Sequence, residues 1–165
     1  MKSRKVSFMG LMIALAMIFS FVESQIPAFV AIPGIKVGLP NLVIVFLLFR
    51  FGWKEAVTVS LIRILLISLL FGNLQTLTFS VAGAVLSLIG MILVKKTRLF
   101  STIAISVLGG VLHNVGQIIA ACLWTATPEV AFYLPVLLIS GTIAGTVIGI
   151  IAGLIVKKFE TFKLF

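Results

Sequence analysis

Long apolar runs separated by short polar breaks limit what this chain can fold into. Six such runs can be drawn: Val6–Val22, Leu39–Phe51, Ala56–Leu70, Leu74–Val94, Thr102–Trp124 and Phe132–Val156. About 20 apolar residues in a helix cross a bilayer core of about 30 Å. With 61% hydrophobic and 10% charged residues, the sequence has too few polar residues for a soluble domain. We therefore predict an all-α integral membrane protein, with residues 1–165 forming a single transmembrane domain of six helices in one bundle.

The positions of the Lys and Arg residues predict how this bundle is oriented. Eleven of the thirteen lie before the first run, after the last run, or in the connections after the second and fourth runs. Cytoplasmic loops of membrane proteins carry an excess of Lys and Arg. We therefore expect both termini to be cytoplasmic in a bacterial cell membrane. Topology and contact with lipid head groups account for the net charge of +9 without a nucleic-acid partner.

The connection Val22–Asn41 is mostly apolar, yet it cannot form one regular helix, because it contains three prolines and two glycines. The run that follows, Leu39–Phe51, covers only about 20 Å of the bilayer core. Irregular backbone at membrane depth is tolerated only where it is buried in protein or lines a cavity. We therefore expect Ile26–Leu39 to fold back into the outer face of the bundle as the lid or wall of a site.

Small residues at intervals of three or four predict where helices pack closely in lipid. The last run carries such a stripe at Gly141, Gly145, Gly149 and Gly153. The fourth run carries a weaker one at Ser80, Gly83, Ser87 and Gly90. We expect both stripes to pack against other helices of the bundle. For Gly10 and Ala14 in the first run two uses stay open, which are packing within the bundle and docking on a partner protein.

Polar residues within apolar runs are the candidates for a binding site. A charge such as Arg63 at the middle of a span costs about 2.5–3.5 kcal/mol on insertion scales and needs partners or water. The candidate ligand-binding residues are Glu23, Lys36, Asn41, Arg63, His113, Asn114 and Gln117. They predict a pocket in the outer half of the bundle, with a cationic or amide-rich floor, for a small molecule from the extracellular side. The alternative is a hydrogen-bond network that ties helices together, with Arg63 paired to Glu23 or to a carbonyl.

Several kinds of chemistry lack the residues they need. The sequence contains no Asp and only four Glu, whereas Mg²⁺-dependent diphosphate chemistry uses clustered carboxylates. It has no GxxxxGK[ST] motif for a nucleotide and no recognisable Ser, His and acid set. His113 is the only histidine and is a poor metal site by itself. We therefore predict no catalytic residues, no metal and no cofactor, and a chain that is not a catalyst alone.

Five short motifs resemble one bacterial membrane family. They are ESQIP at 23–27, PGIKVGLPN at 33–41, GWKEA at 52–56, LHNVGQ at 112–117 and YLP at 133–135. That family is known by two descriptions, heptaprenyl diphosphate synthase component I and Gx transporter family. The resemblance covers nearly the whole chain, and it implies a membrane subunit that works with partner proteins.

The two descriptions imply different functions. The transporter description implies a likeness to the substrate-binding S-component of energy-coupling factor (ECF) vitamin transporters. In those proteins small residues on the first helix, here Gly10 and Ala14, dock on a transmembrane coupling subunit, and separate ATPases supply energy. The synthase description implies a non-catalytic membrane subunit beside a soluble, aspartate-rich prenyl diphosphate synthase for the menaquinone side chain. The S-component-like function is our main prediction, with the synthase subunit or a quinone-linked membrane partner as the alternative.

Overall fold

The protein is all-helical in the computed structural model, which describes residues 2–25 and 37–159. Its helices are α1 Lys2–Gln25, α2 Leu39–Arg50, α3 Trp53–Phe71, α4 Leu74–Thr97, α5 Thr102–Thr125, the 3-10 helix η1 Pro128–Tyr133 and α6 Leu134–Phe159. The predicted all-α class is confirmed for these residues. The first helix is longer than its apolar run, and Phe132 belongs to η1 rather than to the last helix. The greater part of the predicted lid, with Lys36, lies outside the described residues.

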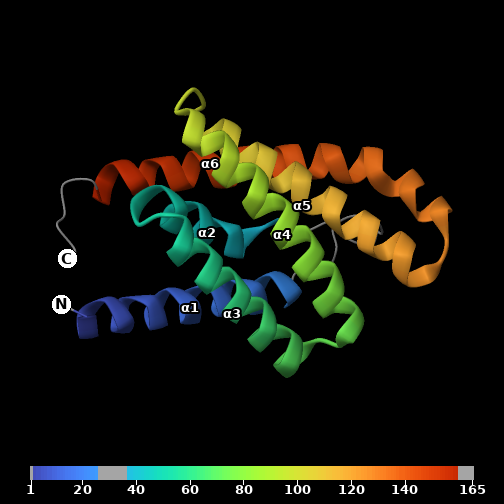
Figure 1. Cartoon of the computed structure of the whole chain (residues 1–165), viewed down its shortest axis with the longest axis horizontal. Coiled ribbons are helices and arrows are strands. Elements are labelled where there is room, and N and C mark those ends of the chain that lie inside the picture. Colours follow the sequence, from blue (N-terminus) through green and yellow to red (C-terminus); the bar gives the residue numbers. More distant parts are fainter. Residues whose placement is uncertain (1, 26–36, 160–165) are drawn as a thin grey trace.

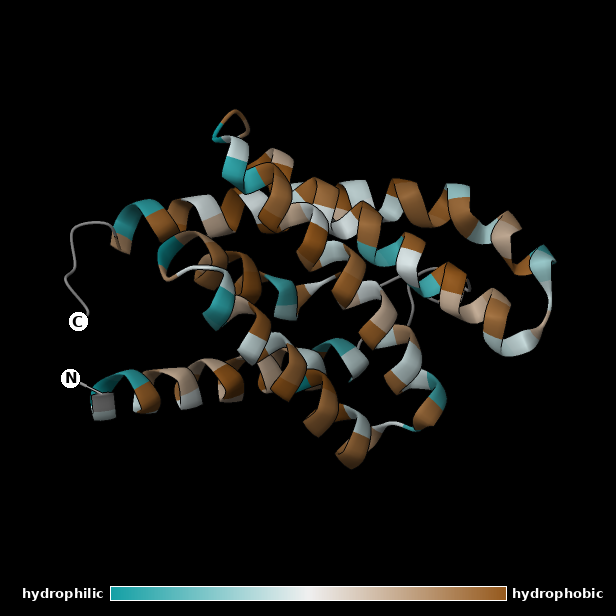
Figure 2. Ribbon diagram, in the orientation of Figure 1, coloured by the Kyte–Doolittle hydropathy of each residue, from teal (hydrophilic) through white to brown (hydrophobic). Residues whose placement is uncertain are grey.

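The outer surface of the bundle is that of a membrane protein. Four helices, α1, α4, α5 and α6, are long and apolar enough to cross a membrane. Large apolar side chains lie exposed on the outside, and Figure 2 shows hydrophobic residues along most of each helix. The helix α2 is shorter than a span, and α3 carries Lys54, Glu55 and Arg63. The prediction that all six helices cross the membrane, and its orientation, therefore stay predictions.

The short helix α2 is the centre of the fold. It contacts α1, α3 and α6, and in Figure 1 it lies between α1 and α6. Nearly every residue from Val43 to Leu48 is almost inaccessible, and these side chains form the main apolar core together with Met12, Ala16 and Ile148. A helix of this length rises only about 18 Å. Because neighbouring helices surround it, α2 does not have to match the thickness of the bilayer by itself.

The helices α4, α5 and α6 pack with their backbones close together. A Cβ added at Gly145 would lie 2.6 Å from Val107 Cα, and one at Gly149 would lie 2.7 Å from Ile103 Cα. Only glycine permits this approach of α5 and α6. The predicted packing of the glycine stripe is thus confirmed at Gly141, Gly145 and Gly149. A Cβ added at Gly153 would lie 3.9 Å from its nearest neighbour, Thr102 Cβ, so this glycine is not needed for the contact.

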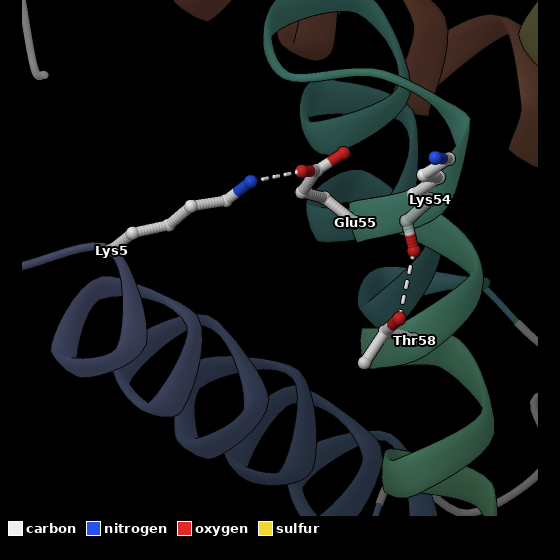
Figure 3. A network of polar contacts seen from close by, with 4 residues as sticks. All are labelled: Lys5, Lys54, Glu55 and Thr58. Atoms are coloured by element: carbon white, nitrogen blue, oxygen red, sulfur yellow. Dashed lines mark hydrogen bonds and ion pairs between the residues drawn. The ribbon is translucent and has the colours of Figure 1, made fainter. Parts of the chain in front are cut away.

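One end of the bundle gathers the beginning of α1, the turn between α2 and α3, and the end of α6 (Figure 1). At this end Lys5 Nζ donates a hydrogen bond to Glu55 Oε1 at 2.5 Å, which ties α1 to the first turn of α3 (Figure 3). The pair lowers the pKa of the Glu55 carboxyl from its usual value. At the opposite end α4 begins with a capping box, in which Asn73 Oδ1 accepts from Thr76 N at 2.8 Å.

Candidate functional site

A cavity of about 440 Å³ lies between the helices, and each of the six α-helices contributes to its wall. At one end it is lined by Ser24 and Gly72, which lie at the end of α1 and just after α3. From there it reaches down to Met91 in α4 and Ser106 in α5. Its volume is in the range of small-molecule sites, which is about 300–1,000 Å³. The cavity is therefore the candidate site of this protein.

The guanidinium of Arg63 is the cationic group of the cavity wall. The buried positions of α3 recur every three or four residues, at Ala56, Val59, Ser60, Arg63 and Ile64. This register turns Arg63 toward the bundle, where the residue is 9% exposed. Its Nη1 donates to Ser20 Oγ of α1 at 3.0 Å, whereas its buried Nε has no hydrogen-bond partner. The charged guanidinium is thus only partly satisfied by hydrogen bonds within the described residues.

The helix α5 contributes the side chains of His113 and Asn114, among others, to the cavity. The imidazole of His113 lies against Gly83 of α4, where an added Cβ would come within 2.9 Å of Cε1. The amide of Asn114 is buried, and its Nδ2 donates to the carbonyl oxygen of Leu137 in α6 at 2.5 Å. Glycines thus allow α4 and α6 to approach α5 at the level where its polar groups lie. Asn114 connects two helices, and its other atoms border the cavity.

The mouth of the cavity is formed where α1 ends and α2 begins. The carboxylate of Glu23 accepts a hydrogen bond from the backbone N–H of Gly38 through Oε1. Gly38 has φ of 80°, a left-handed conformation that favours glycine, and it starts α2. The backbone N–H of Asn41 donates to Gly38 O at 2.9 Å, and Asn41 also lines the cavity. Glu23 therefore fixes the beginning of α2 against the end of α1.

The structure brings most of the predicted site residues together. The predicted site residues that line this cavity are Glu23, Asn41, Arg63, His113 and Asn114. Gln117 is buried but does not border the cavity, and Lys36 lies outside the described residues. Within the described part of the chain no salt bridge joins Arg63 to Glu23, although the Glu23 carboxylate attracts the guanidinium electrostatically. The hydrogen bond from Arg63 to Ser20 connects α3 to α1, so the network alternative also stays open. That these residues bind a ligand stays a prediction.

Sequence reasoning missed a set of serines in the cavity wall. Ser68, Ser80, Ser87 and Ser106 come from α3, α4 and α5 and line the cavity with Arg63. Ser80 and Ser87 belong to a stripe that predicted only helix packing. Serine is ordinary in membrane helices, where its hydroxyl often bonds the preceding turn. No local signal therefore separates these four from a packing serine.

The chemistry of this wall is that of hydrogen-bond donation. Among the described residues no group of three His, Cys, Asp or Glu side chains is placed to hold a metal ion. The donors are the Arg63 guanidinium, the amides of Asn41 and Asn114, and serine hydroxyls, set among apolar side chains such as Val45 and Ile148. Such a wall offers hydrogen-bond donors to an acceptor-rich molecule.

The two predicted docking residues lie on the outer surface of α1. Gly10 and Ala14 are exposed, and a Cβ added at Gly10 would meet nothing within 4 Å. They share this face with the exposed side chains of Leu11 and Ile18. Gly10 therefore does not serve helix packing within the described bundle. Docking on a partner stays a prediction.

The sequence model of one protein family matches residues 12–155, which is most of the chain. The description of this family is heptaprenyl diphosphate synthase component I. The chain belongs to this family. The comparisons with curated proteins and with solved structures found no match. The resemblance stated from the motifs is thereby confirmed, whereas the likeness to S-components is not supported by these comparisons.

Family membership narrows the possible functions. A component I is one part of a synthase and implies a partner synthase subunit. The chain is not itself catalytic, in agreement with the prediction from its lack of Asp and clustered Glu. The family description favours our alternative function over the transporter that was our main prediction.

Proposed function

We propose that this chain is the non-catalytic membrane component of a heptaprenyl diphosphate synthase and holds a soluble catalytic subunit at the membrane. The observation that carries the proposal is the family match over residues 12–155. The residue content supports it, because a chain without aspartate needs a partner to bind Mg²⁺ and diphosphate. The partner would meet the exposed lysines Lys54, Lys96 and Lys157, which lie next to the helix ends that we predict to be cytoplasmic.

The test is capture of partners from the native host. The tagged full chain is extracted in mild detergent, and the chains that accompany it are identified by native mass spectrometry. We expect a soluble, aspartate-rich prenyl diphosphate synthase in the complex. Replacing Lys54, Lys96 and Lys157 together by Gln should reduce its capture, since acidic partners are attracted by surface charge. A complex with a transmembrane coupling subunit and ATPases, and without a synthase, would refute this function.

The second candidate is the substrate-binding subunit of an ECF-type uptake transporter for a vitamin or a precursor. Two observations favour it, the 440 Å³ cavity lined by six helices and the exposed small residues Gly10 and Ala14 on α1. In this function Glu23, Asn41, Arg63, His113 and Asn114 hold the ligand, and the small-residue face of α1 meets the coupling subunit.

One variant separates the two candidates. Ala14→Leu places a bulky side chain on the exposed face of α1 without touching the cavity. The transporter function predicts that it abolishes capture of a coupling subunit and leaves ligand binding intact. The synthase function predicts that capture of the synthase is unchanged. The triple Lys→Gln variant is the matched control, because it should reverse this pattern.

A further inference from the structure

The wall of the cavity is mostly apolar and contains few charges. Among the described residues that line it, only Arg63 carries a fixed positive charge and only Glu23 a negative one. The Glu23 carboxylate is already an acceptor for the Gly38 N–H at the mouth. Arg63 donates through Nη1 to Ser20, and its buried Nε has no partner, so the charge of the guanidinium is only partly satisfied within the described residues. A buried cation that keeps an unused donor is the place for one anionic group.

Serine hydroxyls surround this cation from three helices. Ser68, Ser80, Ser87 and Ser106 line the cavity, and within the described part of the chain their hydroxyls make no hydrogen bond. Ser87 and Ser106 are each only 4% exposed, so they face the cavity and not the lipid. No serine oxygen among the described residues is buried without a partner, so these hydroxyls are open to a bound acceptor or to water in the cavity. Ser68 and Ser80 are half-buried, and the four hydroxyls together suit a ligand with several acceptor oxygens.

We propose that the cavity binds a compact monoanion, whose carboxylate-like group pairs with Arg63 and whose hydroxyl or carbonyl oxygens face Ser68, Ser80, Ser87 and Ser106. The geometry that carries the proposal is the buried guanidinium of Arg63, which lines the cavity and is only partly satisfied by Ser20, in a wall of hydroxyls that have no partner within the described residues. Apolar side chains such as Val45 and Ile148 make up the larger part of the wall and would face the apolar part of the ligand.

A diphosphate does not fit this wall. It carries several negative charges, which buried sites neutralise with several cations or with Mg²⁺ held by carboxylates. The described wall offers one arginine, and no metal-binding group is present among the described residues. The inference deepens the ligand-binding role that the second candidate function gives to the cavity, and it rests on that role. In a prenyl synthase complex, the diphosphate group is then held by the catalytic partner and the cavity serves a different molecule.

The test uses four probes on the purified full chain in detergent at constant ionic strength. Gluconate has one carboxylate and several hydroxyls, acetate has the carboxylate alone, sorbitol has the hydroxyls alone, and inorganic diphosphate has several charges. Binding is measured by isothermal titration and by the rise in Tm. We expect gluconate to bind more tightly than acetate, and sorbitol and diphosphate to bind more weakly than either. The proposal is overturned if diphosphate binds as tightly as gluconate. It is also overturned if neither gluconate nor acetate binds at 100 mM, which is about the weakest affinity that such a site would have.

Variants test separately the pairing of the anion with Arg63 and the contacts of the ligand with the serine hydroxyls. Arg63→Gln should weaken gluconate and acetate by about tenfold or more, because a hydrogen bond to a charged group is lost. Arg4→Gln, at an exposed site far along α1, removes the same charge and should change neither. Ser87→Ala with Ser106→Ala should weaken gluconate several-fold and leave acetate unchanged. This double variant keeps the proposal testable even where Arg63→Gln does not fold.

The results of these binding experiments do not depend on which partner protein is captured with the chain. Equal affinities in Arg63→Gln and Arg4→Gln would show that the anion does not bind at Arg63 and would overturn the inference. Equal loss of acetate and gluconate in the serine double variant would show that the hydroxyls do not contact the ligand, and would overturn it as well. Neither result changes which synthase or coupling subunit accompanies the chain. Failure of this inference and failure of the proposed function are therefore distinguishable.

Discussion

The two sides of the cavity are built in different ways. On the side of α4, α5 and α6, glycines bring the backbones together, as at Gly110, where an added Cβ would lie 2.5 Å from Gly141 O. On the side of α1, α2 and α3, side chains fill the space between helices, as in the pair of Phe8 and Phe51 with ring centroids 4.9 Å apart. The first side is fixed by backbone contact and the second by interdigitating side chains.

This difference shows how the site is divided. The glycine-packed side supplies small and neutral groups, such as Ser87, Ser106 and Asn114. The side-chain-packed side supplies both charges, Arg63 and Glu23. Backbones in contact cannot separate without losing many interactions, whereas side chains can change rotamer. We therefore expect substitutions to affect folding most on the first side and charge recognition most on the second.

The largest loss of stability is expected from a substitution at the contact of α5 with α6. Gly145→Leu forces a side chain against Val107 Cα, where even a Cβ would lie at 2.6 Å. Overpacking costs about 1–3 kcal/mol and more where backbones must move. We expect little folded protein and a greatly lowered Tm in detergent. Gly153→Leu, one turn beyond the contact on the same helix, is the control and should be near wild type. Equal losses in both variants would remove the distinction between the two sides.

The second largest loss of stability is expected from removing the hydrogen bond between α5 and α6. Asn114→Ala removes the donor to Leu137 O in a buried place. Loss of a buried hydrogen bond costs about 1–2 kcal/mol. Unfolding followed by circular dichroism should show this loss. Thr142→Ala, which removes an exposed hydroxyl bonded to Leu138 O within α6, is the control and should cost much less. A stable Asn114→Ala variant would mean that the glycine contacts alone hold the two helices.

A smaller change in stability is expected from removing the charge of Arg63, on the side of α1, α2 and α3. Arg63→Met replaces a buried cation by an apolar side chain of similar length. Such replacements are often neutral or stabilising, so the free energy of unfolding should change by about 1 kcal/mol or less. Ser20→Ala, which removes the acceptor and leaves the cation, should destabilise more than Arg63→Met. A large loss of stability in Arg63→Met would show that Arg63 ties helices together and is not kept for a ligand.

The smallest effect is expected at the exposed pair of Lys5 and Glu55. The hydrogen bond from Lys5 lowers the pKa of Glu55 in the folded protein. The pair therefore stabilises the protein above the usual glutamate pKa of about 4.5 and loses this contribution as the pH falls through the lowered value. Exposed pairs contribute about 0.2–1 kcal/mol. Wild type and Glu55→Gln should thus differ in Tm at pH 7 and converge once the pH lies below the lowered pKa of Glu55. A difference that persists at low pH would contradict this account.

The sequence predicted the positions of the helices because apolar runs in lipid must satisfy their own backbone hydrogen bonds. Every run drawn from hydropathy corresponds to a helix, and the glycine stripe of α6 identified the face that meets α5. It predicted the site in part. Polar residues within apolar runs are costly, so Arg63, His113 and Asn114 were recognisable before the fold was known.

Other features depend on how the helices are turned and where the cavity ends. His113 and Gln117 share one face of α5 by spacing, yet only His113 borders the cavity. Ser68, Ser80, Ser87 and Ser106 look like packing residues in the sequence, and only the approach of three helices places them around one space. The shortness of α2 suggested a missing depth of membrane, whereas its neighbours in the fold surround it.

The sequence by itself thus determined the membrane class, the helices and the rare polar groups within them, because these depend on the local cost of placing each residue in lipid. The tertiary structure decided which of those groups share a cavity, which glycines are indispensable and which donor of Arg63 is left unused. These features depend on distances between residues far apart in the chain, set by the packing of α1–α3 against α4–α6.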